Sequence, residues 1–269
     1  MKSFKMKALA VAVLGLAGLG LASSASAACP TDPFSAWSSD TGGVNSGAQL
    51  GGQTVGIAPG LNSTGCAMQA KLTTAPGSNS EEAVVFDNSP QKEQTYRFRF
   101  YVDPSAIGTS LSNINTVEAF AALSGSTHGP VLTQKLVAIN FVAVTGAIKL
   151  RTFVACTSGD GLLAGRCKST AGDLALPAFT AGTGVRVEGQ LIIGAAGTGK
   201  LNLWVGTNTG TPDRTINVDN SAWGTASGDG VVQAVMGLGN STPNFRTAAV
   251  NKAVLFDEFD SRRQTAIGN

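Results

Sequence analysis

The stretch Gln94–Val102 constrains the fold more than any other, because its side chains alternate strictly between aromatic and charged. Tyr96, Phe98 and Phe100 fall on one side of the extended chain, and two arginines fall on the other. A period of two residues is the pattern of a β-strand with one buried side and one solvent-facing side. We therefore expect this strand to bury its aromatic side against a second layer.

Further short apolar or alternating stretches recur along the chain, separated by turns rich in Gly, Ser, Thr and Pro, and helical periodicity is nearly absent after residue 27. The predicted strands are Ala67–Leu72, Glu82–Phe86, Val117–Leu123, Leu132–Val144, Ala147–Cys156, Val185–Ile193, Lys200–Val205, Arg214–Val218, Val231–Leu238 and a final strand over residues 248–260. Many short strands without intervening helices predict an all-β fold, a two-sheet antiparallel sandwich.

The final predicted strand ends in a group of carboxylates. Val254 and Phe256 can point inward, while Asp257, Glu258 and Asp260 gather where the strand leaves the sheet. An apolar strand of this kind needs neighbours that bury it and a cation that neutralises its acidic end. We expect it to lie in the middle of one sheet.

The first 27 residues have the features of a signal peptide. A positive segment with Lys2, Lys5 and Lys7 precedes an apolar run of small residues, and Ala25-Ser26-Ala27 matches a signal-peptidase site. Cleavage is expected before Ala28, which predicts export to the periplasm or the extracellular space. The alternative is an uncleaved anchor helix, but the apolar run is short for a span of about 20 residues. No later stretch is predicted to cross a membrane.

The predicted mature chain has almost no net charge. The full chain has 19 basic and 17 acidic residues, and removing the three lysines leaves 16 basic residues. Nucleic-acid binding and polybasic membrane binding need concentrated positive charge, so composition disfavours both. We divide the chain into the signal peptide (1–27), a loop-rich N-terminal segment packed on the sandwich (28–66), and the β-sandwich (67–269).

Four cysteines in an exported chain predict two disulfides. Three connectivities are open in principle. Spacing favours Cys156–Cys167 across a Gly-rich loop, which leaves Cys29–Cys66 to fix the N-terminal segment. A cysteine metal site is the alternative, but the sequence has no Cys-x-x-Cys pair.

Three stretches resemble a known superfamily. Tyr96–Val102 carries alternating aromatic residues, and the hairpin Val185–Gly206 has a small-residue turn before an apolar-x-apolar-Trp-Val strand. Leu255–Phe259 closes the chain on an apolar-Asp-acidic-apolar strand. Together they resemble the concanavalin A-like lectin/glucanase superfamily in its laminin-G-like bacterial form, over about residues 67–263. The resemblance implies a jelly roll of two curved antiparallel sheets, with sugars or a calcium ion at the rim as common ligands.

The catalytic patterns known for this fold are absent from the sequence. Glycosidases of the superfamily carry Glu-x-Asp-x-(x)-Glu along one strand, and only the misordered Asp257-Glu258-x-Asp260 approaches it. Lyases need a basic residue or a tyrosine opposite the acidic C5 of the sugar, and no Gln-x-His motif is present. The lone histidine, His128, lies in a Gly/Ser turn that is typical of an exposed loop. The segment Gly194–Lys200 matches a phosphate-loop spacing, but Leu201 replaces the required Ser or Thr and strands flank it on both sides.

Carboxylates at the end of the last strand are candidate calcium ligands. Asp257, Glu258 and Asp87 are the first candidates, and Asp260 and the upstream Asp103 are further ones. Calcium takes oxygen ligands that a sandwich rim can assemble from separate strands. The alternative is a charge cluster that arginines such as Arg97, Arg99, Arg262 and Arg263 neutralise. No cofactor is required, and a bound calcium is expected to be structural.

Aromatic residues beside polar ones are the candidate sugar-binding groups. Trp204 shares a strand face with Asn202, an arrangement that suits stacking and hydrogen bonding to a sugar. The alternative is that this face packs on a neighbouring loop. Trp223 on a predicted loop and Tyr101 complete the candidate ligand site, and Trp37 and Phe245 are further platforms.

These features predict a secreted, non-catalytic carbohydrate-binding or surface-interaction protein with a glycan partner. One alternative is a polysaccharide hydrolase or lyase on the same fold that uses scattered acids such as Glu188 or Asp257. A second alternative is a structural protein of the envelope or matrix.

Overall fold

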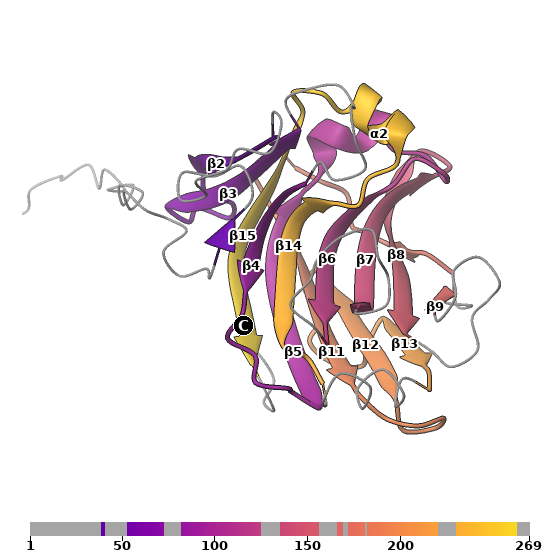
Figure 1. The fold of residues 1–269 in the computed structure, drawn as a ribbon. Helices are drawn as coiled ribbons and strands as arrows, with labels where there is room; N and C mark the ends of the chain where they lie inside the picture. The colour runs from indigo at the N-terminus through magenta and orange to yellow at the C-terminus, as the bar shows by residue number, and fades with distance from the viewer. Residues whose placement is uncertain are drawn as a thin grey trace, which may run out of the picture.

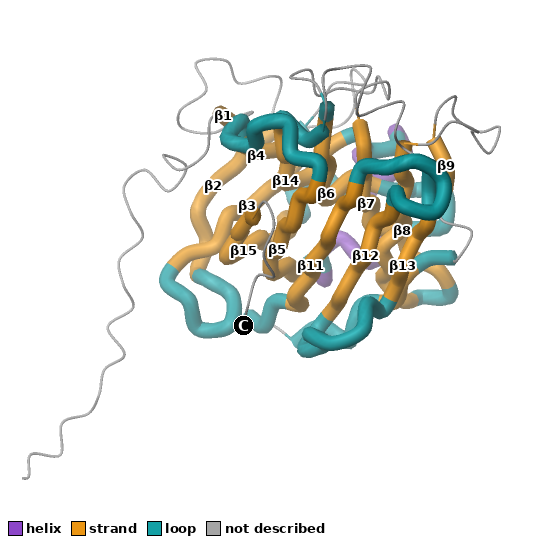
Figure 2. Tube along the Cα trace, turned by 90° about the horizontal axis from the view of Figure 1, so that it is seen from below, coloured by secondary structure: helices purple, strands orange, loops and turns teal. Residues whose placement is uncertain are grey.

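The structure, a computed structural model, describes residues 39–40, 53–72, 82–124, 135–155, 166–168, 172–180, 182–219 and 230–262. These residues form two antiparallel β-sheets that face each other, as Figure 1 and the view along the layers in Figure 2 show. The predicted fold class, an all-β jelly-roll sandwich of two antiparallel sheets, is confirmed.

Sheet A has eight described strands in the order β1-β4-β14-β6-β7-β8-β10, with β9 paired to β8. The bounds are β1 Ser39–Asp40, β4 Ala83–Asp87, β6 Val117–Leu123, β7 Lys135–Val144, β8 Ala147–Ala155, β9 Arg166–Lys168, β10 Leu174–Ala175 and β14 Gln233–Gly239. Sheet B has seven described strands in the order β13-β12-β11-β5-β15-β3-β2. Its bounds are β2 Gln53–Pro59, β3 Cys66–Leu72, β5 Thr95–Asp103, β11 Val185–Ile192, β12 Lys200–Val205, β13 Arg214–Asn217 and β15 Ala253–Arg262.

Aromatic rings join the two sheets across the core. Phe98 of β5 stacks on Phe120 of β6, with ring centroids 4.0 Å apart. Phe100 and Phe256 extend the cluster within sheet B at 6.0 Å. The prediction from the alternation of β5 is therefore confirmed: the aromatic side is buried between the sheets, and the arginine side faces outward.

Gly189 of β11 makes room for this cluster. A Cβ atom added there would lie 2.1 Å from Cζ of Phe98, on the strand opposite. Phe98 thus occupies the volume that a larger residue at 189 would need, which explains a glycine inside a strand.

The last strand lies in the middle of sheet B, between β5 and β3, as predicted. It begins later than predicted, because residues Pro243–Ala248 form the short helix α2 and a turn leads from there to Ala253. Pro243 is compatible with the first helical turn, where its missing N–H is not needed. A bulge between Asp257 and Asp260, with Glu258 at φ 46, bends the strand near its end.

The hairpin β11–β12 is antiparallel, and its turn contains Gly197 at φ 89. The segment that matched a phosphate-loop spacing therefore belongs to the hairpin connection over residues 193–199. A second short helix, the 3-10 helix η1 (Ser105–Ser110), packs near α2 at one end of the sandwich. No helix in the described ranges is long and apolar enough to span a membrane.

The described cysteines include no free thiol, and Cys66 at the start of β3 is disulfide-bonded. Cys29 and Cys156 lie outside the described residues, so the pairs Cys29–Cys66 and Cys156–Cys167 stay predictions. The predicted signal peptide also lies outside them. In the predicted loop-rich segment 28–66, β1 and β2 form an edge of each sheet.

Candidate functional site

The outer face of sheet A carries an apolar floor on β4, β14 and β6 and a polar row that runs from β6 across β7 to β8. The floor is a small cluster of side chains that point away from the main core: Val84, Ala121, Leu123 and Val235, with Phe86 packed against it. The polar row consists of Glu118 of β6, Asn140 of β7 and Arg151 of β8. Strand register places Glu118 directly opposite Asn140, and Asn140 directly opposite Arg151. We call these three residues the sheet A row.

Lys135, the first residue of β7, forms an ion pair with Glu118 along this face. Its Nζ donates to both carboxylate oxygens of Glu118, at 2.9 and 2.8 Å. The side chains are 0% and 4% exposed, so both charges are removed from water. The amide of Asn240, just after β14, also donates to Glu118 at 3.2 Å. Burying two charges is costly unless each is paired and hydrogen-bonded, which this geometry provides.

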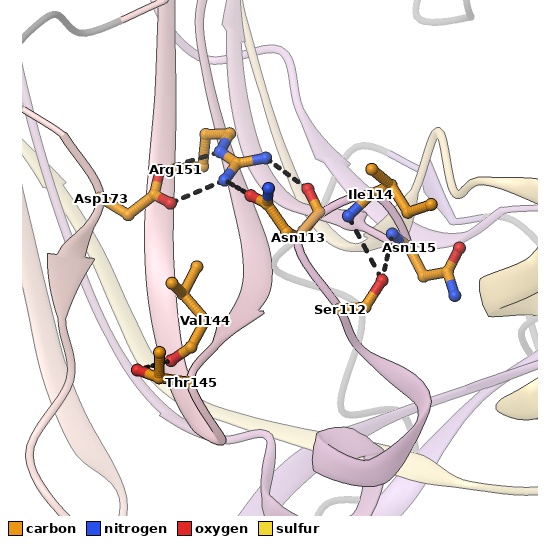
Figure 3. A network of polar contacts seen from close by, with 8 residues as sticks. All are labelled: Ser112, Asn113, Ile114, Asn115, Val144, Thr145, Arg151 and Asp173. Carbon is orange, nitrogen blue, oxygen red and sulfur yellow. Dashed lines mark hydrogen bonds and ion pairs between the residues drawn. The ribbon is translucent and has the colours of Figure 1, made fainter.

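Arg151 is held rigidly at the other end of the row (Figure 3). Its Nε and Nη2 donate to the two carboxylate oxygens of Asp173, at 2.8 and 2.7 Å. Its Nη1 donates to the backbone carbonyl of Asn113 at 2.7 Å, and Nη2 also reaches the Asn113 side chain. This bidentate arrangement orders the loop before β6 and the segment before β10 around one guanidinium.

Asn140 stands between these two charged groups. It is half-buried, and its side-chain amide makes no hydrogen bond to any residue in the described part of the chain. The amide can therefore donate to one ligand oxygen and accept from a ligand hydroxyl. A carboxylate or a hydroxyl placed over Asn140 would lie between the Glu118–Lys135 pair and the Arg151 guanidinium.

The predicted ligand residues lie on the opposite side of the molecule, on the outer face of sheet B. Trp204 of β12 is 8% exposed, and its Nε1 donates to the Gly210 carbonyl at 2.7 Å. Arg97 covers its ring, with the guanidinium carbon 5.5 Å from the ring centroid. Asn202 and Tyr101 are half-buried on the same face. A sugar-binding role of these residues stays a prediction, but Trp204 is not an open platform.

Other predicted platforms are elsewhere. Phe245 of α2 is fully buried in the core. Trp223, Trp37 and His128 lie outside the described residues.

The carboxylates predicted to bind calcium have separate protein partners. Asp257 is buried and accepts the Leu61 N–H at 2.8 Å and the Thr64 hydroxyl. Asp87 accepts the Ser89 N–H at 2.8 Å, and Glu258 is exposed at the bulge. No group of three or more acidic, histidine or cysteine side chains suited to a metal occurs among the described residues. The calcium site stays a prediction.

Two further acidic residues named in the sequence have structural contacts. Asp103 is buried and accepts the Ser105 N–H at 2.9 Å, at the start of η1. Glu188 lies on the outer face of sheet B between Arg97 and Arg186.

The two tyrosines of the chain are both away from the sheet A row. Tyr96 points into the core, where burial raises its pKa well above the ordinary value of 10.0 and nearby negative charge adds to the shift. Its hydroxyl therefore stays protonated and is unsuited to act as a base.

Sequence patterns did not single out Glu118, Lys135, Asn140 or Arg151. A signal was available for Glu118, which is the one polar residue of the strand Val-Glu-Ala-Phe-Ala-Ala-Leu, and for Asn140, which interrupts the apolar run of β7. A charged residue in a central strand is expensive and usually has a partner or a function.

Comparison with known proteins identifies the fold. No protein-family model and no curated protein matches the chain. Among solved structures, an endo-β-1,4-glucuronan lyase from the fungus Trichoderma reesei matches with a TM-score of 0.51 at 15% identity, covering 86% of this chain and 92% of that one. A variant of the alginate lyase Aly36B in complex with alginate trisaccharide matches with a TM-score of 0.54 at 12% identity, covering 78% and 94%.

The globular domain of T. cruzi calreticulin also matches, with a TM-score of 0.50 at 6% identity, covering 86% of this chain and 85% of that one. Identities this low show a shared fold alone. The chain thus has a jelly-roll sandwich like that of polysaccharide lyases, and its activity has to be argued from the site.

Proposed function

We propose that the protein is an exported polysaccharide lyase that cleaves a uronate-containing polymer on the outer face of sheet A. The observation that carries this proposal is the sheet A row, in which the open amide of Asn140 lies between two ion pairs. Solved lyases with the same fold, including the glucuronan and alginate lyases above, support it. The lyase alternative from the sequence is thereby favoured over the purely binding role.

The chemistry of uronate elimination explains why such a row suits the reaction. The proton at C5 is adjacent to a carboxylate, and removing it places more negative charge on that group. Donors fixed where the charge develops lower the barrier, because they need no reorganisation during the reaction. In the proposal the Asn140 amide binds the substrate carboxylate, and the nearby guanidinium of Arg151 contributes positive potential.

We assign the proton transfers to the Lys135–Glu118 pair. In its uncharged form, the Lys135 amine accepts the C5 proton. The C4–O4 bond then breaks as the C4–C5 double bond forms, and the carboxylic acid of Glu118 gives its proton to the departing O4. The pair ends as the ion pair observed at 2.8 Å, and transfer of one proton from Nζ to the carboxylate regenerates the uncharged form. No other group is needed for this return, because Nζ donates directly to the Glu118 carboxylate.

An absorbance assay tests the proposal. The purified protein is mixed with polymannuronate, polyguluronate or polyglucuronate, and the ultraviolet absorbance of the unsaturated uronate is followed, with dextran as the uncharged control polymer. We expect a rise with at least one polyuronate and none with dextran. No rise in absorbance with any of the three polyuronates would refute the proposal.

One observation favours a second candidate function, glycan binding without cleavage. The side chains of Lys135 and Glu118 are 0% and 4% exposed, so in this structure they do not meet solvent. The same fold in a calreticulin domain is consistent with a role other than that of a lyase. Retention of the protein on an immobilised polyuronate, with no unsaturated product released, would establish binding instead of cleavage.

A further inference from the structure

A second polar surface crosses the outer face of sheet B. Arg97 of β5 is directly opposite Gln190 of β11, Gln190 is opposite Asn202 of β12, and Asn202 is opposite Thr215 of β13. These four residues, which we call the sheet B strip, form one straight row across four neighbouring strands. With strands about 4.8 Å apart, the row spans roughly 14 Å.

Hydrogen bonds join three of the four strip residues. The Asn202 amide donates to Gln190 Oε1 at 3.2 Å, and the Thr215 hydroxyl donates to Asn202 Oδ1 at 2.8 Å. Gln190 and Asn202 are half-buried and Thr215 is exposed, so solvent reaches the row. The Gln190 side-chain amide keeps its N–H donors for a ligand. The spacing of strip residues on neighbouring strands is close to the length of one pyranose unit of an extended polymer.

Positive charge is concentrated beside the strip although the predicted mature chain is almost neutral. Next to the strip, β11 and β12 carry two outward-facing cations, Arg186 and Lys200, against one anion, Glu188, and Arg97 of β5 adds a third cation. Glu188 is 3% exposed and bonds to both Arg97 and Arg186. One carboxylate therefore serves two guanidiniums, which leaves an excess of positive charge.

The guanidiniums also keep unused donors. The Nε atoms of Arg97 and Arg186 are shielded from solvent and have no hydrogen-bond partner. Arg186 is 4% exposed and is fixed by the Asn208 carbonyl at 2.7 Å. Trp204 underlies the Arg97 guanidinium in a cation–π contact and so positions it. Buried donors without a partner are costly. An anionic ligand group beside these guanidiniums would balance their excess positive charge.

We propose that the sheet B strip is a second binding site, separate from the sheet A row, for the chain of an anionic polysaccharide. The polymer runs across the strands. Its carboxylates or sulfates lie against Arg97 and Lys200, and its hydroxyls bond to Gln190, Asn202 and Thr215. The site holds the protein on polymeric substrate and takes no part in bond cleavage.

The test separates this site from the sheet A row. Binding of alginate, chosen as a polyuronate probe, is measured by affinity electrophoresis in the background Lys135→Met/Glu118→Leu, which removes the proposed proton-transfer pair and so prevents cleavage during the measurement. We compare Arg97→Gln/Lys200→Gln with the matched control Lys92→Gln/Lys252→Gln, which removes the same charge away from the strip. We expect about tenfold weaker binding for the strip variant only, the effect of losing a charge-assisted hydrogen bond.

A second variant, Asn202→Ala/Thr215→Val, keeps every charge and is expected to weaken binding about threefold, as the loss of a neutral hydrogen bond does. Initial rates on short oligouronates in the otherwise unchanged protein should stay the same for both strip variants. Equal losses in the strip and control variants would show a diffuse charge effect and overturn the site. So would the absence of alginate binding in the disabled background, whatever the lyase assay shows.

Discussion

The buried Lys135–Glu118 pair gives the sharpest quantitative prediction. Replacing Lys135 with Met leaves the Glu118 carboxylate buried, with the Asn240 amide at 3.2 Å in place of a cation. Removing one partner of a buried pair costs about 3–5 kcal/mol. For a domain of this size that corresponds to a fall of roughly 6–20 °C in Tm.

The double variant Lys135→Met/Glu118→Leu should recover most of this loss. It replaces two desolvated charges with apolar groups of similar volume, and residue 135 lies directly opposite Leu123 of the floor. Such exchanges are often neutral or stabilising by about 1–4 kcal/mol. The matched control is Lys149→Met, a lysine of the neighbouring strand β8, for which we expect a change within about 0.5 kcal/mol.

Urea denaturation of the wild type, the two single variants, the double variant and the control supplies the comparison. We expect a coupling energy of at least about 2 kcal/mol between residues 135 and 118. A cost below about 1 kcal/mol for Lys135→Met would mean that the pair behaves like an exposed surface bridge, and the reasoning from burial would be wrong.

Three further results are expected. Gly189→Ala should lower the free energy of unfolding by about 1–3 kcal/mol, because its Cβ would meet the Phe98 ring at 2.1 Å; an unchanged urea midpoint would contradict this packing. Stability should fall as pH rises above about 10, because the unfolded chain then loses the Tyr96 proton that the fold keeps; Tyr96→Phe should flatten that slope, and an equally steep slope in the variant would refute it. Asp257→Ala should cost about 1–3 kcal/mol in urea denaturation by leaving the buried Leu61 N–H without its acceptor; a loss below about 0.5 kcal/mol would contradict that role.

Strand positions were the part of the fold that the sequence predicted best. β6 and β12 have the predicted bounds, and the aromatic side of β5 is buried. Alternation is a local property of a strand, so the sequence reports it directly. The prediction that the last strand lies in the middle of one sheet is also confirmed.

The helix α2 was missed for a physical reason. Thr242 followed by Pro243 is a helix-start signal, but the stretch from Ala248 onward was interpreted as one apolar strand. The six-residue helix and the turn after it occupy residues 243–252, so the strand begins only at Ala253.

The candidate site was harder to predict because it depends on contacts between strands. Lys135 and Glu118 are 17 residues apart, and Asn140 meets Glu118 only through the register of β6 and β7. Alternation assigned Trp204 and Asn202 to one face correctly, but it could not show that Arg97 and the Gly210 carbonyl cover the indole.

The most direct test of the account compares two proteins in the unsaturated-uronate assay, the wild type and the folded double variant Lys135→Met/Glu118→Leu. The account predicts a steady rise of absorbance with a polyuronate for the wild type and none for the double variant, even though both unfold at similar urea concentrations. Equal rates in the two proteins, or no product from the wild type on any polyuronate, would contradict it.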